Sequence, residues 1–294
     1  RIECYMAVGN TNQAVEELTK LIATSKEGEG IALVRQLLDQ LDKEFANANM
    51  AHNLELQRVT AKNEAMLTHY LVDWSKKTPS VAKFYYAYAV YDARTQRLAG
   101  SLAENPAERK KLLVEASERF RGLQSKEMHA LYIAQKAVKD QIDAGALSPD
   151  DGDPQVATGL ALTEFDLGNY KGAKEQLDGL IANKKLGTPQ IESIDPATGE
   201  RKLKDNDLYW EGTLKSIKSS YEVAKAANDA KALSVAAQSL KNMLVRGGIP
   251  DRWQEGFEAL RKDLAPDYNP TAPIASQKPA TTQAAAGTTP VSAK

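Results

Sequence analysis

Residues 156–177, VATGLALTEFDLGNYKGAKEQL, decide the fold. Apolar residues recur at helical spacing from Val156 to Phe165, and helical spacing resumes after Tyr170. Between the two runs, Leu167-Gly168-Asn169-Tyr170 has the small and polar residues that favour a tight turn. The stretch therefore predicts two helices joined by a short turn, which is a helical hairpin.

The same spacing occurs twice more in the chain. Near the start, Asn10, Ala14 and Leu18 have the same spacing as three residues of the central hairpin: Asn169, Ala173 and Leu177. An alanine early in a second helix lets two backbones approach closely, and a leucine four residues later fills the space between neighbouring hairpins. A looser third copy comprises Ala227-Asn228, Ala232, Ala236 and Leu240.

This pattern resembles the tetratricopeptide repeat, in which a turn glycine is followed by small and large apolar positions at helical spacing. The resemblance implies an α-solenoid, a right-handed stack of antiparallel helical hairpins that bury one continuous apolar seam. The sequence departs from the family pattern at Ala157, where the family has a large aromatic residue. It also departs at Lys26 and Lys185, where the family has a terminating proline. Another all-α solenoid or bundle stays open.

The chain to Leu264 is predicted to be helical apart from one insertion. Polar caps followed by proline mark helix starts at Thr78-Pro79, Asn105-Pro106 and Asp153-Pro154, and Asn47-Ala48-Asn49 marks a break. One helix between residues 48 and 144 is left without a partner, which predicts a break in the regular pairing. Besides the central hairpin, we expect helices over residues 2–8, 10–25, 29–45, 51–74, 79–100, 107–123, 127–144, 207–226, 228–245 and 251–264.

The insertion falls within residues 188–204. Two short alternating runs, Gln190–Ile194 and Arg201–Lys204, flank the turn-forming residues 195–199 and predict a small β-hairpin. From Ala265 onward the chain consists mostly of Ala, Thr, Pro, Ser and Gln, which predicts a disordered tail over 265–294. We therefore expect one helical-repeat domain over residues 1–264. Because Arg1 falls within half a hairpin, we expect a trimmed N-terminus, and the localisation stays open.

The composition excludes several classes of protein. The 294 residues carry a formal net charge of -1, so no strong field would gather nucleic acid. No apolar run approaches the roughly 18 residues of a membrane span. The single cysteine, Cys4, excludes an internal disulfide and a cysteine-based zinc site.

Candidate partner-binding residues lie first on the aromatic helix after Pro79. Tyrosine and arginine are favoured where a partner docks, because each offers a large area with a polar tip, so we select Tyr85, Tyr88 and Arg94. The alternative is a buried helix whose tyrosines pack between neighbours, and we expect the tyrosines to divide between both roles.

The resemblance supplies a second set. Proteins of the tetratricopeptide type bind peptides on the concave surface formed by the first helix of each hairpin. By that analogy the candidates in this chain are Gln155, Thr158, Leu162, Phe165 and Asp166. Phe165 could equally belong to the core.

Signals for catalysis and for metal binding are weak. His52, His69 and His129 are far apart and have no metal-ligand spacing, and no nucleophile elbow, phosphate-binding loop or dinucleotide fingerprint is present. Residues 150–153 are rich in Asp but lack a complete calcium loop, and they suit a cap for the helix at Pro154. We therefore predict no metal, no cofactor and no enzyme activity.

The sequence thus predicts a non-catalytic scaffold or adaptor that binds a peptide or a partner helix. One alternative is a structural subunit of a larger assembly, for example one at the cell envelope, and such a subunit would self-associate. The other is the helical-repeat region of an enzyme whose catalytic domain lies upstream.

Overall fold

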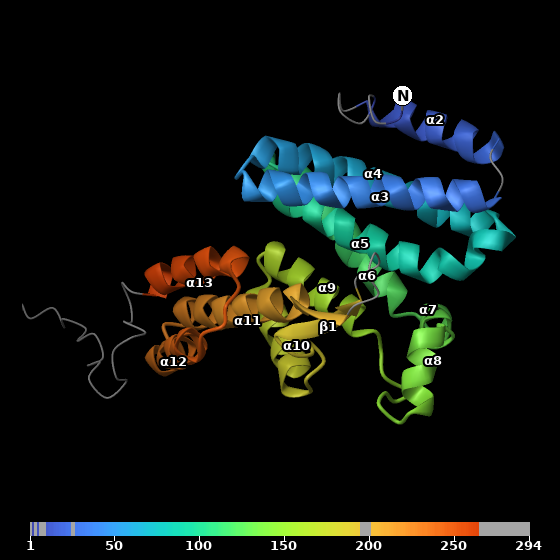
Figure 1. Ribbon diagram of the computed structural model, residues 1–294. Helices are drawn as coiled ribbons and strands as arrows, with labels where there is room; N and C mark the ends of the chain where they lie inside the picture. The colour runs from blue at the N-terminus through green and yellow to red at the C-terminus, as the bar shows by residue number, and fades with distance from the viewer. Residues whose placement is uncertain (1, 3–4, 6–9, 25–26, 195–200, 265–294) are drawn as a thin grey trace, which may run out of the picture. The chain divides into compact units, whose positions relative to one another are not determined.

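The fold is taken from a computed structural model (Figure 1), which describes residues 2, 5, 10–24, 27–194 and 201–264. The chain divides into two units, residues 1–212 and 213–294, and each is described by itself. Most of the described residues are helical and the described strands form one two-stranded sheet, so the all-α prediction is confirmed. Two of the predicted segments fall largely or wholly outside the described residues: the helix over 2–8, of which residues 2 and 5 are helical, and the tail over 265–294.

The N-terminal unit begins with three helices: α2 (Thr11–Thr24), α3 (Glu27–Met50) and α4 (Leu54–Lys77). Figure 1 shows α3 and α4 lying side by side. The predicted break at residues 47–49 is wrong, because Ala48 is buried and extends the apolar stripe of α3. The break falls later, where Asn53 Oδ1 accepts a hydrogen bond from the Leu56 N–H and caps α4. The three helices share one core: Ala14, Leu18, Val34, Leu37, Leu41, Leu67 and Leu71.

The segment after Pro79 starts as a 3-10 helix, η1 (Pro79–Phe84), and becomes an α-helix only in α5 (Tyr85–Leu102). Thr78 precedes η1 as predicted, but its side chain forms no capping hydrogen bond. Helix α5 packs closely on α4, because small residues at the contact, Ala61, Ala65 and Ala99, let the backbones approach.

Helix α6 (Pro106–Leu123) starts as predicted, with Asn105 Oδ1 accepting hydrogen bonds from two backbone N–H groups. The single helix predicted over 127–144 is wrong, because the chain forms α7 (Lys126–Ile133) and α8 (Lys136–Asp143). Tyr132 and Val138 both enter the core around Phe120. In a continuous helix these two residues would lie about 120° apart around the axis. The break between the helices lets both be buried.

The predicted central hairpin is confirmed as α9 (Pro154–Asp166) and α10 (Tyr170–Ala182). Gly168 has a φ of 83°, which glycine adopts without strain, and Asn169 Oδ1 accepts a hydrogen bond from the Gly172 N–H. Ala173 and Leu177 are both 0% exposed, as close packing of the two helices requires.

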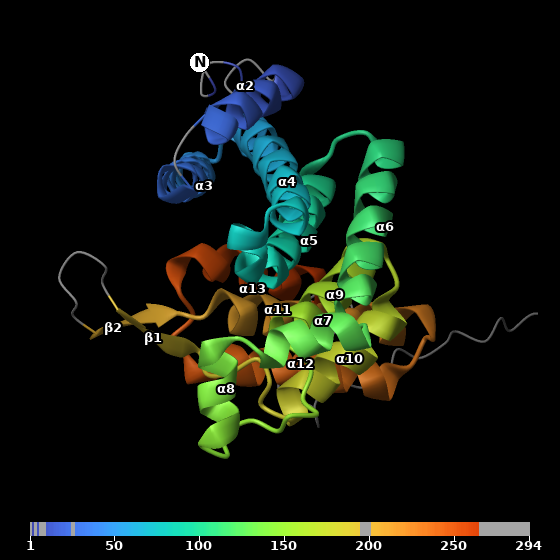
Figure 2. The same ribbon diagram turned by 90° about the vertical axis from the view of Figure 1, so that its right-hand side faces the viewer.

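The predicted β-hairpin is confirmed as the antiparallel strands β1 (Gln190–Ile194) and β2 (Arg201–Asp205). The predicted turn between them lies outside the described residues. The two strands project from the helices as a ribbon (Figure 2). The base of the ribbon is fixed by Asn206, whose Nδ2 donates to the carbonyl oxygens of Leu186 at 2.8 Å and Thr188 at 2.9 Å.

Helix α11 (Asp207–Ala226) starts in the N-terminal unit and continues into the C-terminal unit, which also contains α12 (Ala230–Arg246) and α13 (Asp251–Leu264). Within the C-terminal unit, the Tyr221 hydroxyl of α11 donates to the Asp263 carbonyl oxygen of α13 at 3.1 Å. The third copy of the turn is shifted by one residue from its predicted register. Asp229 caps α12, while Asn228 takes a positive φ of 50°.

Candidate binding site

A pocket of about 540 Å³ lies within the N-terminal unit, where α3, α4, α5, α6 and α9 approach the β-ribbon and the start of α11. This volume falls in the range of sites that hold a small ligand or several side chains of a partner. Its apolar lining comes from five helices and one strand: Phe45, Leu98, Phe120, Leu162, Leu208 and Ile191.

Three oxygen-bearing side chains meet on one wall of the pocket. The Tyr91 hydroxyl of α5 lies 2.9 Å from Asp42 Oδ1 of α3 and also hydrogen bonds with Glu64 Oε1 of α4. Asp42 is exposed, whereas Glu64 is only 4% exposed. A single phenolic proton serves only one carboxyl oxygen at a time. Hydrogen bonds can therefore link all three groups only when a second proton is present, and we place this proton on Glu64.

The surroundings of Glu64 favour that proton. Burial raises the pKa of Glu64 from its ordinary value of 4.5 to about 7, and the neighbouring Asp42 carboxylate adds to the rise. The Tyr91 hydroxyl and the positive charge of Arg94 oppose the shift without cancelling it. Glu64 thus gains and loses a proton near neutral pH. Burial, Glu64 and Asp42 likewise raise the pKa of the Tyr91 hydroxyl, which stays protonated.

Arg97 fixes a second wall of the pocket. Its Nε donates to Asp166 Oδ2 at 2.8 Å, at the end of α9, and its Nη2 donates to Glu211 Oε1 at 2.6 Å, in the first turns of α11. Burial alone would lower the pKa of the guanidinium, but Glu211 and Asp166 outweigh this effect and raise it. Because breaking a buried ion pair is costly, Arg97 holds α5, α9 and the start of α11 together.

Three polar side chains of the pocket form no hydrogen bond or ion pair with the rest of the described chain. Arg94 of α5, Lys204 of β2 and Gln155 of α9 line it and are exposed. Within the described residues, the side chains of these three make no hydrogen bond or ion pair. Their hydrogen-bonding capacity is available to a ligand.

The predicted binding residues are only partly brought together. Arg94, Gln155 and Leu162 line the pocket. Asp166 does not line it but forms an ion pair with Arg97, which does. Phe165 and Thr158 are buried: the Phe165 ring packs edge-on against Tyr170, and the Thr158 hydroxyl donates to the Pro154 carbonyl oxygen at 2.7 Å.

Tyr85 and Tyr88 are not among the residues that line this pocket. Tyr85 is half-buried under Lys76, whose Nζ lies 5.4 Å from the ring centre. Tyr88 is half-buried against the core of α2, α3 and α4, with its ring 6.0 Å from that of Phe84. The aromatic helix thus uses these two tyrosines mainly for packing.

Sequence reasoning missed Asp42, Glu64 and Lys204. For Glu64 a signal was present, because it lies on the buried face of α4, with Ala61 three residues before it and Leu67 three residues after it. An acidic residue within an apolar stripe indicates a buried carboxyl group with a specific environment. Asp42 and Lys204 carry no such local signal, because each is an exposed charged residue, as is ordinary for a protein surface.

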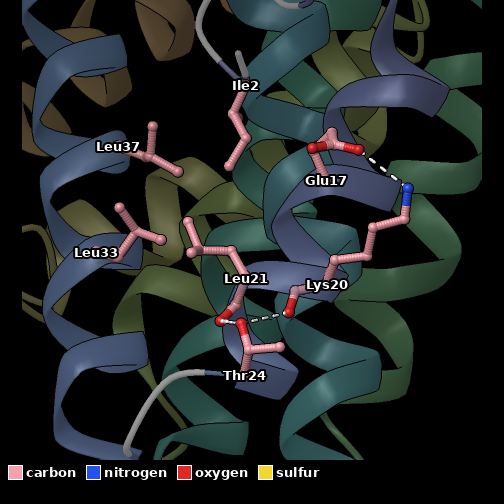
Figure 3. Close-up of a pocket in the computed structure, with 7 residues that line it drawn as sticks. All are labelled: Ile2, Glu17, Lys20, Leu21, Thr24, Leu33 and Leu37. Carbon is pink, nitrogen blue, oxygen red and sulfur yellow. Dashed lines mark hydrogen bonds and ion pairs between the residues drawn. The ribbon is translucent and has the colours of Figure 1, made fainter.

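A second pocket, of about 530 Å³, lies between α2 and α3 (Figure 3). Its apolar side chains, Leu21, Leu33, Leu37 and Ile2, point toward one another, and the ion pair of Lys20 with Glu17 lies at one side. This groove therefore offers an apolar surface with few polar groups to orient a ligand.

Comparison of the chain with protein families, with characterised proteins and with solved structures found no match. Among the described residues, no three side chains of His, Cys, Asp or Glu gather in a way that would hold a metal ion. In the same part of the chain, no helix has both the length and the apolar character to cross a membrane. The function must therefore be argued from the pocket of the N-terminal unit.

Proposed function

We propose that this chain is a non-catalytic binding protein, and that the pocket bounded by α5, α9 and the β-ribbon takes a segment of a partner protein. The observation that carries the proposal is the lining of this pocket. Apolar side chains line it together with Arg94, Gln155 and Lys204, whose side chains make no hydrogen bond or ion pair within the described residues. Sites that bind ligands combine apolar area with a few polar groups in this way.

The β-ribbon favours a peptide segment over a free small molecule. Ile191 and Lys204 bring β1 and β2 to the rim of the pocket. The described sheet has two strands, so each strand has an outer edge whose backbone groups no other described strand pairs. An extended peptide can hydrogen bond to such an edge while one of its side chains enters the adjacent pocket.

The repeat pattern supports the same class of function. We propose that the hairpin α9–α10 and the similar spacing at Asn10, Ala14 and Leu18 belong to a divergent tetratricopeptide-like solenoid. In such proteins the first helix of each hairpin faces the ligand, and here Gln155 and Leu162 of α9 line the pocket. The fold alone is a weak guide to function, so the pocket carries the argument.

The test is a selection of peptides from a random library, displayed by fusion and panned on the immobilised full chain. We expect one family of related peptides to be enriched by the wild-type protein and by Gln141→Trp, which places an indole on exposed α8. Gln155→Trp should lose this family, because its indole would fill the mouth of the pocket. Enrichment of no family, or of one that Gln155→Trp retains fully, would refute the proposal.

A further inference from the structure

The charges in the pocket indicate the chemistry of its occupant. Arg94 and Lys204 are exposed cations that line the pocket and make no ion pair within the described residues. Two acidic groups of the lining, Asp42 and Glu64, hydrogen bond with the Tyr91 hydroxyl and form no ion pair with either cation. Arg94 and Lys204 are thus cations whose side-chain hydrogen-bond donors no described residue uses.

The remaining carboxyl groups of the pocket are also engaged. Glu211 accepts a hydrogen bond from Arg97, and Asp205 and Asp207 take part in interactions within the chain. These carboxylates keep their negative charge, but within the described residues none of them forms an ion pair with Arg94 or Lys204. An incoming negative charge would meet two cations whose hydrogen-bond donors are unused.

An apolar surface lies beside the two cations. Ile191 on β1 is 38% exposed, and Phe45 and Leu98 are half-buried in the pocket lining. Covering these side chains would remove apolar area from water, which favours binding. A ligand that matches this lining has an apolar group close to its negative charge.

We propose that the occupant is a segment of a partner protein in which an acidic side chain lies next to a large apolar side chain. The carboxylate pairs with Arg94 and Lys204, and the apolar side chain packs against Ile191, Leu98 and Phe45. This inference rests on the proposed function and adds the chemical identity of the ligand.

A carboxylate suits the pocket better than a phosphate group does. A phosphate carries about -1.5 to -2 charges at neutral pH. It would meet the same two cations but would also face Asp42, Asp205 and Asp207, which line the pocket as well. Attraction and repulsion both grow in proportion to the ligand charge, whereas the cost of removing that charge from water grows faster. The singly charged side chain of Asp or Glu is therefore favoured.

The experiment uses the peptide selection on the full chain and compares two arginine variants. The wild-type protein should enrich peptides with Asp or Glu beside Leu, Ile, Phe or Trp. Arg94→Glu should lose this acidic preference, whereas Arg109→Glu, at an exposed position of α6, should keep it. In fluorescence anisotropy, the best peptide should bind Arg94→Glu about tenfold more weakly or worse, because a rim cation is replaced by a repelling charge.

Two further comparisons keep the inference falsifiable. Arg94→Gln, which adds no negative charge, should also weaken the peptide, and exchanging the acidic residue of the peptide for its amide should have a similar effect. Circular dichroism and the Tm check that each variant folds. A pocket-dependent peptide family without acidic residues, or one insensitive to both Arg94 variants, would overturn this inference and leave the proposed function standing. Enrichment of no family would overturn both.

Discussion

At Glu64, a carboxyl group is held away from water beside the second carboxyl group of Asp42. The folded protein raises the pKa of Glu64 from 4.5 to about 7, so between these values the folded state binds a proton that the unfolded chain has lost. The stability that depends on this proton is fully present below about pH 4.5. It is lost as the pH rises through about 7, because ionised Glu64 is then buried close to Asp42.

Replacement of Glu64 by glutamine tests this linkage. The amide keeps an oxygen for the Tyr91 hydroxyl but never ionises, so Glu64→Gln should become more stable relative to wild type as the pH rises from 4.5 to 7. By pH 8 the difference in the free energy of unfolding should reach up to roughly 3 kcal/mol, measured by denaturant titration. Asp73→Asn removes an exposed carboxyl group of the same helix and should leave the pH dependence unchanged. Parallel wild-type and Glu64→Gln curves would contradict the assigned protonation.

At the scale of the element, α9 depends on a glycine because of what packs against it. A Cβ added at Gly159 would lie 2.3 Å from Cε1 and Cζ of the Phe120 ring. That ring is 0% exposed and sits in the core shared by α5, α6, α7, α8 and α9, so it has little room to move. The helix propensity of alanine is therefore outweighed at this position by overlap with the ring.

A pair of matched substitutions separates these two effects. Gly159→Ala should lower the free energy of unfolding by about 1–3 kcal/mol through overpacking. Gly179→Ala, on the neighbouring helix α10, meets no atom within 4 Å and should raise it by about 0.5–1 kcal/mol. Denaturant titration of both variants measures the changes. If Gly159→Ala proved as stabilising as Gly179→Ala, the packing of α9 on α6 would be wrong.

Two helix starts were predictable because their signals are local. Asn105 and Asp153 each cap the helix that follows through their own side-chain oxygen, within three residues of sequence. The division between α7 and α8 was not predictable in this way. It depends on Tyr132 and Val138 both reaching the core around Phe120, and that demand comes from tertiary packing.

At the scale of the whole molecule, the pocket is assembled from residues that are far apart in sequence. Arg94, Gln155 and Leu162 were predicted as binding residues from residue type and from a resemblance, and the structure places all three in its lining. Asp42 and Lys204 belong to the pocket only because α3 and β2 are folded against α5 and α9. No local pattern marks such positions, so only the tertiary structure identifies them.

Protonation and ligand binding are linked through this assembled pocket. The groups that face Glu64 are Asp42 from α3 and Tyr91 and Arg94 from α5. Below pH 7 Glu64 is mainly neutral, and the positive charge of Arg94 is available to an acidic side chain of the ligand. As the pH rises, ionised Glu64 attracts Arg94 and repels the ligand carboxylate, which weakens binding.

The acidic peptide should therefore bind more weakly at pH 8 than at pH 6, by about three- to tenfold in Kd at low ionic strength. Glu64→Gln should bind the peptide with nearly the same Kd at pH 6 and at pH 8, because this variant lacks the carboxyl group that titrates. Linkage is reciprocal, so the bound peptide should also raise the pH at which wild-type Glu64 ionises, which nuclear magnetic resonance of the labelled carboxyl carbon can follow. An equal loss of affinity in wild type and Glu64→Gln would assign the pH dependence to another group and would separate Glu64 from the binding site.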